Sequence, residues 1–168
     1  MKMRRLAVSS VVLASFVAVL TGPVWWPGGS ARAALAPTIA VIPVSGIVVG
    51  QPESVAFSGQ AQISSELVLD TSHFNKPPSV ILIVDLSGVS GRGRSSEARY
   101  VVGGDGTTMF RQLASTDTIE IPFPFSRGTS MGTSSVRTGV ASFALSFDLQ
   151  TGAITSGTAN IASPSFPY

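Results

Sequence analysis

The chain has 168 residues, a formal net charge of +2 and no cysteine. The missing thiol excludes disulfide bonds, zinc–thiolate sites, thiol catalysis and lipid attachment through an N-terminal cysteine. The length is that of one ordinary domain, which can bury a core without disulfides.

Residues 1–33 have the layout of a secretory signal peptide. Lys2, Arg4 and Arg5 form a basic start, and an apolar run, "LAVSSVVLASFVAVL", follows from Leu6 to Leu20. Small-residue cleavage sites come next, at 31–33 and 34–36. Because the run is shorter than the roughly 20 apolar residues of a membrane span, we expect export and cleavage. The alternative is an uncleaved N-terminal anchor.

Cleavage after residue 33 changes the charge of the working protein. It removes four of the eleven basic residues and none of the nine acidic ones, so residues 34–168 carry seven against nine, or −2. Nucleic acid is therefore not expected as a partner, since phosphate binding needs a basic face. The expected location is periplasmic or extracellular, with membrane contact only through the signal peptide unless it stays uncleaved.

After residue 36 the periodicity is nearly all that of β-strands. The segment 38–49 is rich in β-branched residues and is interrupted at Pro43 and Gly46. From 53 to 70 the odd positions are mainly apolar and the even positions carry mainly hydroxyls and amides. The segment from Ser79 is apolar on both faces up to Val84, which predicts a central strand covered on both sides.

The second half continues the pattern. The sequence "GGDG" (103–106) lies between "ARYVV" and "TTMFRQL" and predicts a hairpin turn. In "DTIEIPFPF" (117–125), Pro122 and Pro124 lack an N–H, so this strand is expected to be an edge or to leave the sheet there. Two further strands are expected in 140–149 and 153–162, joined by a "QTG" turn.

These segments give roughly eight strands and no amphipathic helix. The predicted fold is a single all-β domain over 34–168, either an antiparallel β-sandwich or a small β-barrel of about eight strands. Two strands are too long for a flat sheet of this size, so bends or bulges are expected at Gly59 and near Gly139.

Residue types that carry catalysis are scarce. His73 is the single histidine and lies in a predicted loop. Asp70 and Asp85 could form a carboxylate pair for glycoside hydrolysis, but Asp85 also fits a solvated face or an ion pair with Arg99 or Arg111. One carboxylate in "GGDGTT" does not make a calcium loop. We therefore predict no catalytic residues, no metal and no cofactor.

The arginines give the one positive site prediction. Arg92, Arg94 and Arg99 lie within eight positions in "GRGRSSEAR". Their guanidinium groups suit phosphate, sulfate or carboxylate, so this loop is a candidate for binding an anionic surface. Glu97 partly neutralises the loop, and a plain solvated turn is the alternative.

The functional prediction is an exported, non-catalytic β-domain with a binding or structural role. A first alternative is a small barrel that binds an apolar ligand, because the interior of an eight-stranded barrel can hold one small ligand. Its cavity would be lined by residues that fit a dry core equally well: Phe57, Ile63, Phe143, Leu145 and Phe147. Further alternatives are an outer-membrane β-barrel and a secreted hydrolase.

Overall fold

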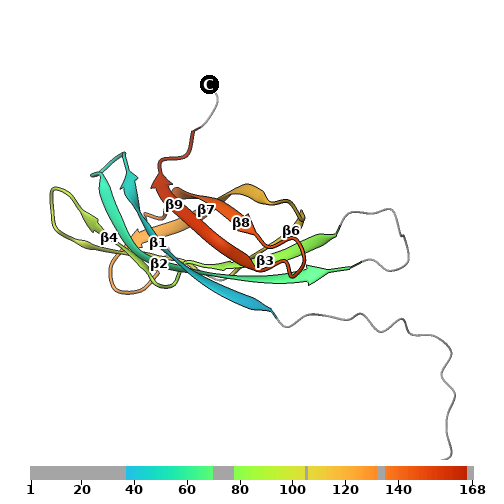
Figure 1. Cartoon of the computed structure of the whole chain (residues 1–168). Coiled ribbons are helices and arrows are strands. Elements are labelled where there is room, and N and C mark those ends of the chain that lie inside the picture. Colours follow the sequence, from blue (N-terminus) through green and yellow to red (C-terminus); the bar gives the residue numbers. More distant parts are fainter. Residues whose placement is uncertain (1–36, 70–77, 105, 132–134, 166–168) are drawn as a thin grey trace, which may run out of the picture. The chain divides into compact units, whose positions relative to one another are not determined.

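The computed structural model describes residues 37–69, 78–104, 106–131 and 135–165, which all belong to the unit Arg32–Tyr168. The expected signal peptide lies outside these residues. The described part is all-β, as predicted, with no helix and nine strands (Figure 1). The strands are β1 (Thr38–Val48), β2 (Val55–Val68), β3 (Ser79–Asp85), β4 (Val89–Gly93), β5 (Arg99–Val102), β6 (Thr107–Gln112), β7 (Thr116–Arg127), β8 (Arg137–Phe147) and β9 (Ile154–Ala162).

The strands form one large sheet that contains a ring. Seven of them close on themselves in the order β1, β2, β4, β5, β7, β8, β9 and back to β1. All these pairings are antiparallel except the last, in which β9 runs parallel to β1 through the pair Gly46 and Ile161. A side chain at Gly46 would overlap the Ile161 carbonyl oxygen, so glycine permits this close approach. The remaining two strands, β3 and β6, extend the sheet from the far half of β2.

β3 and β4 follow each other in the chain and are separated only by residues 86–88. Both pair with the same edge of β2, β3 with residues 62–68 and β4 with residues 55–59. Between the two ladders, three residues (86–88) face two on β2, which is a β-bulge. Gly59 stands beside it, and a side chain there would overlap the Gly88 carbonyl oxygen. The expected irregularity at Gly59 is therefore confirmed. Near Gly139 the β7–β8 ladder has no bulge, because its register runs unbroken past it.

The predicted hairpin at 103–106 is also wrong. β5 and β6, on its two sides, do not pair with each other. They continue along the same partner segment instead, β5 beside β4 and β6 beside β3. The glycines thus lie between β5 and β6, beside the bulge at 86–88. The hairpin turn of this region is at 94–98, between β4 and β5. The central position expected for β3 is confirmed by pairing on both edges, but its second face is not covered, since Ile83 is exposed.

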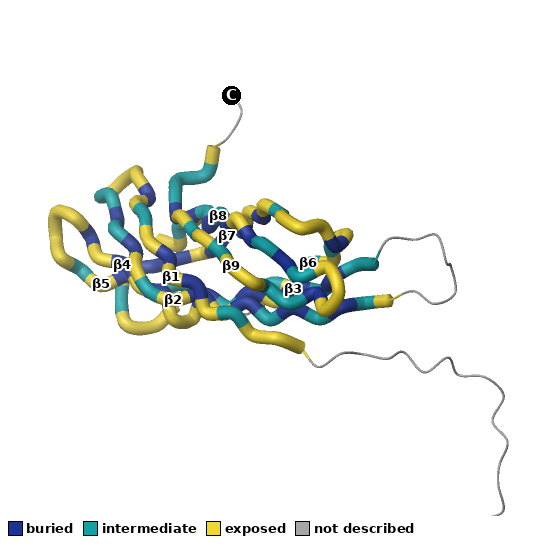
Figure 2. Tube along the Cα trace, viewed as in Figure 1, coloured by how far each residue is buried: buried dark blue, intermediate teal, exposed yellow. Residues whose placement is uncertain are grey.

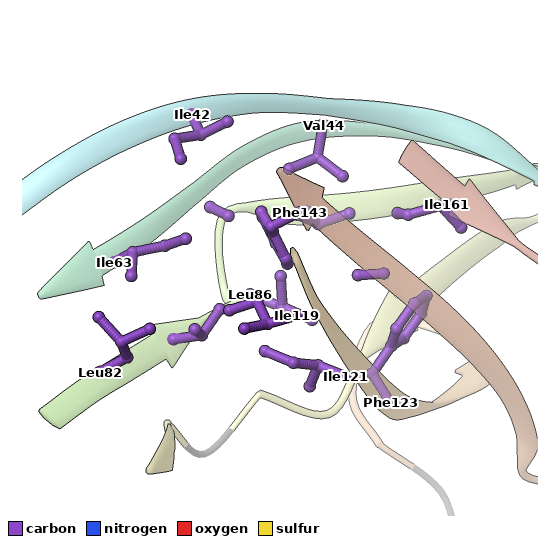
Figure 3. Packing of buried hydrophobic residues seen from close by; sticks show 14 of the residues in the cluster. Ile42, Val44, Ile63, Leu82, Leu86, Ile119, Ile121, Phe123, Phe143 and Ile161 are labelled. Carbon is purple, nitrogen blue, oxygen red and sulfur yellow. The ribbon is translucent and has the colours of Figure 1, made fainter. Parts of the chain in front are cut away.

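The core is one cluster of buried apolar side chains to which most of the strands contribute. Figure 2 shows buried positions alternating with less buried ones along the strands, while the turns are exposed. In Figure 3, side chains of β7 and β8 face those of β2 and β3, with Phe143 and Ile119 near the middle. Four aromatic rings pack at the β4–β5 end, with Phe57 and Phe125 in edge contact at 4.9 Å.

Candidate functional site

The sheet opens along a seam between β6 and β7. The two strands share no ladder in the described residues, although they follow each other in the chain. The Gly103 N–H still donates to the Pro124 carbonyl (2.8 Å), and β7 then has no ladder on its β5 side, while its pairing with β8 continues. Because the Pro124 carbonyl points to this side, so do the backbones of Pro122 and Pro124, which have no N–H to give. Among the described residues, no strand pairs with β7 on this side at its prolines, which confirms the expected edge. β7 does not leave the sheet there, since it stays paired with β8 past both prolines.

An ion pair bridges the seam at its other end. The Arg111 guanidinium on β6 donates two hydrogen bonds to the Asp117 carboxylate on β7, of 2.8 and 2.9 Å. These bonds lower the pKa of Asp117 and raise that of Arg111. Arg111 is thus paired with Asp117 and not with Asp85, the partner considered from the sequence.

At the Gly103–Pro124 link lies a pocket of about 540 Å³, which we call the seam pocket. Its deepest lining comes from four buried apolar side chains: Val84, Leu86, Ile121 and Phe123. Around them stand Val102, Gly103, Gly104, Thr107, Pro122, Pro124 and Met131. The pocket exists because two strand edges that could have paired are held apart, and its lining is predominantly apolar.

Two further hollows continue the seam pocket along β5. One of about 380 Å³ shares Val102 and Met131 with it and reaches Ser90 and Arg99. The next, of about 240 Å³, shares Ser90 and Arg99 and adds Arg92 and Glu97. We call the three together the seam groove. Each neighbouring pair has lining residues in common, so the apolar end and the arginine end adjoin along β5.

The structure brings two of the three predicted arginines together. Arg92 on β4 lies directly opposite Arg99 on β5. Glu97 places a carboxylate oxygen 3.6 Å from the Arg92 guanidinium, with both side chains about three-quarters exposed (77% and 74%). Arg94 is exposed in the turn, where its N–H donates to the Ser54 carbonyl, and it does not line the groove.

The five residues proposed for an apolar cavity are all buried in the core cluster. None of them lines the seam pocket, whose residues come from β3 and from the segments around β5 to β7. The sequence signal for the actual pocket was the pair of prolines in β7. They mark where β7 has no partner on its β5 side, while it stays paired with β8. Met131 carried no signal, since it reaches the groove from a loop.

Glu53 is a site residue that the sequence did not point to. Its carboxylate accepts hydrogen bonds from the N–H groups of Ser95 and Ser96, both 3.0 Å, and from the Ser96 and Tyr100 hydroxyls. The Ser96 hydroxyl, followed by these N–H groups, lowers the pKa of Glu53 to about 2, against a weaker effect of burial. Burial and the contact with Glu53 raise the pKa of Tyr100.

This network fixes the hairpin turn that carries the arginine end of the groove. Arg137 on β8 holds Glu53 in turn, because it donates to the Glu53 carbonyl oxygen (2.7 Å), and it stacks over Phe125 at 5.0 Å. The turn at 94–98 is therefore anchored by Glu53, and Arg92 and Arg99 stand on either side of it.

Of the remaining polar candidates, the structure describes Asp85. Asp85 accepts a 2.7 Å hydrogen bond from the Ser87 N–H and so stabilises the bulge. Asp70 and His73 lie outside the described residues. Within those residues, no three acidic, histidine or cysteine side chains are grouped as a metal site would require.

A search of the described ranges for a helix with the length and hydrophobicity of a membrane span finds none. No protein-family model, curated protein or solved structure matches the chain, so the geometry of the seam groove has to carry the functional argument.

Proposed function

We propose that the protein is an exported, non-catalytic binding domain that takes an apolar small molecule into the seam pocket. The observation that carries this proposal is an apolar pocket of about 540 Å³ at a seam where two neighbouring strands fail to pair. Pockets for small ligands have volumes of roughly 300–1,000 Å³ and mostly apolar walls. Burial of an alkyl or ring system there would remove the exposed parts of Pro122, Pro124 and Met131 from water.

Binding is favoured over catalysis by the lining of the pocket. None of the eleven residues named for it has a titratable side chain. Its polar groups are the Thr107 hydroxyl and backbone groups, which can orient a ligand but supply no general acid or base.

For the architecture, we propose a barrel in preference to a sandwich. The support is the ring of seven strands, which β1 completes by pairing with β2 over its whole length and with β9 at Gly46. A barrel has no sheet edges within its ring. The β3–β6 extension leaves the ring, so the seam is the place where the enclosed core approaches the surface.

For the location, we propose export with removal of the leader. The support is the basic start, the apolar run and the two small-residue sites in residues 1–36. N-terminal sequencing of exported material should begin at Ala34, or at Pro37 if the second site is used. Recovery of intact Met1 in a membrane fraction would contradict this.

The ligand proposal is tested by a neutral apolar fluorophore, N-phenyl-naphthylamine, added to the purified residues 34–168. Thr107→Phe should fill the pocket and weaken binding of the probe at least tenfold. Thr108→Phe is the matched control, because Thr108 is the next residue, is exposed and does not line the pocket. No probe binding to the unchanged protein, or equal loss in both variants, would overturn the proposal.

A further inference from the structure

We propose that the seam groove is one site for a single-chain amphiphile with a monoanionic head, of the kind of a free fatty acid. The chain enters the seam pocket and the carboxylate meets Arg99 and Arg92. This inference rests on the proposed function, because it takes apolar binding in the seam pocket as given and adds the head group and its direction.

The first support is that the sections of the groove adjoin along β5 and share lining residues. Arg99, Val101 and Val102 all line its middle section, and Val102 and Met131 also line the seam pocket. Three residues separate Arg99 from Val102, which is about 10 Å along a strand. Arg99 and Val102 leave opposite faces of β5, so a molecule with its head at Arg99 reaches the seam pocket past Met131, which lines both sections. A compact apolar ligand would leave the arginine end empty.

The second support is the charge at the arginine end. Arg92 and Arg99 bring two positive charges to facing positions, and Glu97 brings one negative charge to the same hollow. The net charge of these three side chains is +1, which matches a monoanionic head. With the leader removed the protein is net negative, so its body would oppose long-range attraction of a polyanionic surface.

The third support is the contact that Glu97 already makes. Its carboxylate lies 3.6 Å from Arg92, so a carboxylate fits beside this guanidinium. Both partners are largely exposed, and such pairs contribute little stability. The head group of a ligand can therefore take the place of Glu97 on Arg92, or lie between Arg92 and Arg99.

The fourth support is the side chain at the join of the two sections. Met131 is half-exposed and lines both the seam pocket and the middle of the groove. Methionine is flexible and adapts to irregular apolar shapes. It can lie along an alkyl chain that passes from one section to the other.

The experiment compares dodecanoate with dodecanol, each displacing N-phenyl-naphthylamine below its micelle concentration. Because one hydrogen-bonded charge contact is added, we expect dodecanoate to bind about tenfold more tightly than dodecanol. Arg99→Gln should abolish this difference and leave dodecanol binding unchanged. Arg94→Gln is the charge-matched control from the same turn and should preserve the difference, since Arg94 does not line the groove.

Further measurements fix the direction of the ligand. Lengthening the acid from octanoate to dodecanoate should tighten binding by up to about fourfold for each methylene that enters the pocket. Thr107→Phe should weaken both dodecanoate and dodecanol. Added salt should weaken dodecanoate alone.

The outcomes separate the two proposals. Equal binding of acid and alcohol, both weakened by Thr107→Phe, would overturn the head-group inference and leave the apolar site standing. Binding of neither compound would overturn the proposed function together with the inference. Equal losses in Arg94→Gln and Arg99→Gln would show a diffuse positive surface and overturn the inference as well.

Discussion

The Arg111 guanidinium on β6 holds the Asp117 carboxylate on β7 through two hydrogen bonds, across the point where the strands separate. Arg111 and Asp117 lie on either side of the short turn between β6 and β7. Their side chains supply the link that backbone hydrogen bonds between the two strands would otherwise make. Arg111 is about half-exposed and Asp117 is less so. The pair lines a separate hollow together with Phe110, Gln112 and Ala114.

Breaking this pair should loosen the seam at moderate cost to the fold. Asp117→Asn removes the charge and should lower the free energy of unfolding by about 1 kcal/mol, since a partly exposed bidentate pair is near the upper end for surface ion pairs. Urea unfolding of Asp117→Asn, Arg111→Gln and the double variant measures the coupling. Losses that simply add in the double variant would mean that the two side chains contribute independently.

The Glu53 carboxylate should make the hairpin turn at 94–98 sensitive to acid. Its pKa is about 2 in the folded protein, below the value of an unpaired glutamate, so its stabilising effect is full above about pH 4.5. The effect is lost progressively as pH falls from there towards 2. Unfolding free energy should fall over this window, and Glu53→Gln should flatten that part of the profile. A parallel fall in both proteins would assign the acid sensitivity elsewhere.

Truncation to alanine should lower the free energy of unfolding far more at Phe143 than at Phe110. Phe143 is fully buried, so Phe143→Ala should cost roughly 3–5 kcal/mol, as expected for an aromatic removed from a packed core. Phe110 lies on the outer face of β6 with 66% of its surface exposed, so Phe110→Ala should cost less than about 1 kcal/mol. Chemical denaturation of both variants measures the two losses in unfolding free energy. A small loss at Phe143 would contradict the packing described around it.

The prolines of β7 should protect the seam from pairing. Replacing Pro122 and Pro124 together by threonine restores two N–H groups on an unpaired edge, which is a template for another strand. We expect increased self-association in light scattering and weaker uptake of apolar probe. Pro164→Thr, beyond the last strand, is the control and should change neither. A double variant that behaves like the unchanged protein would show that the prolines do not keep the seam open.

Local chemistry made most of the strands predictable. Alternation from 53 to 70 placed Phe57 and Ile63 inward, and the missing N–H groups of Pro122 and Pro124 marked where a strand leaves its neighbour. These features depend on a few adjacent residues. The sequence therefore sufficed for the all-β class and for the unpaired edge at the prolines of β7.

What could not be predicted depends on pairing between distant segments. The glycines at 103–106 look like a hairpin turn because only their neighbours are visible in the sequence, whereas the structure uses them to pass the bulge at 86–88. For the same reason the arginine end of the groove could be found as a cluster, but its connection to an apolar pocket could not. Met131 and Glu53 reach the site from other loops, and nothing in their immediate neighbours indicates this.

The join of Gly46 to Ile161 has a consequence for the order of folding. Most other pairings in the ring connect segments that are close in the chain, and those can form early because little loop entropy is lost. The β1–β9 contact joins the first and last strands, so we expect it to form after the rate-limiting step. Gly46→Ala should then speed unfolding and leave the folding rate nearly unchanged. Stopped-flow kinetics in urea, with Ser45→Ala as the control, would show this as a shift of the unfolding limb alone, and a slower folding limb would instead make ring closure part of the nucleus.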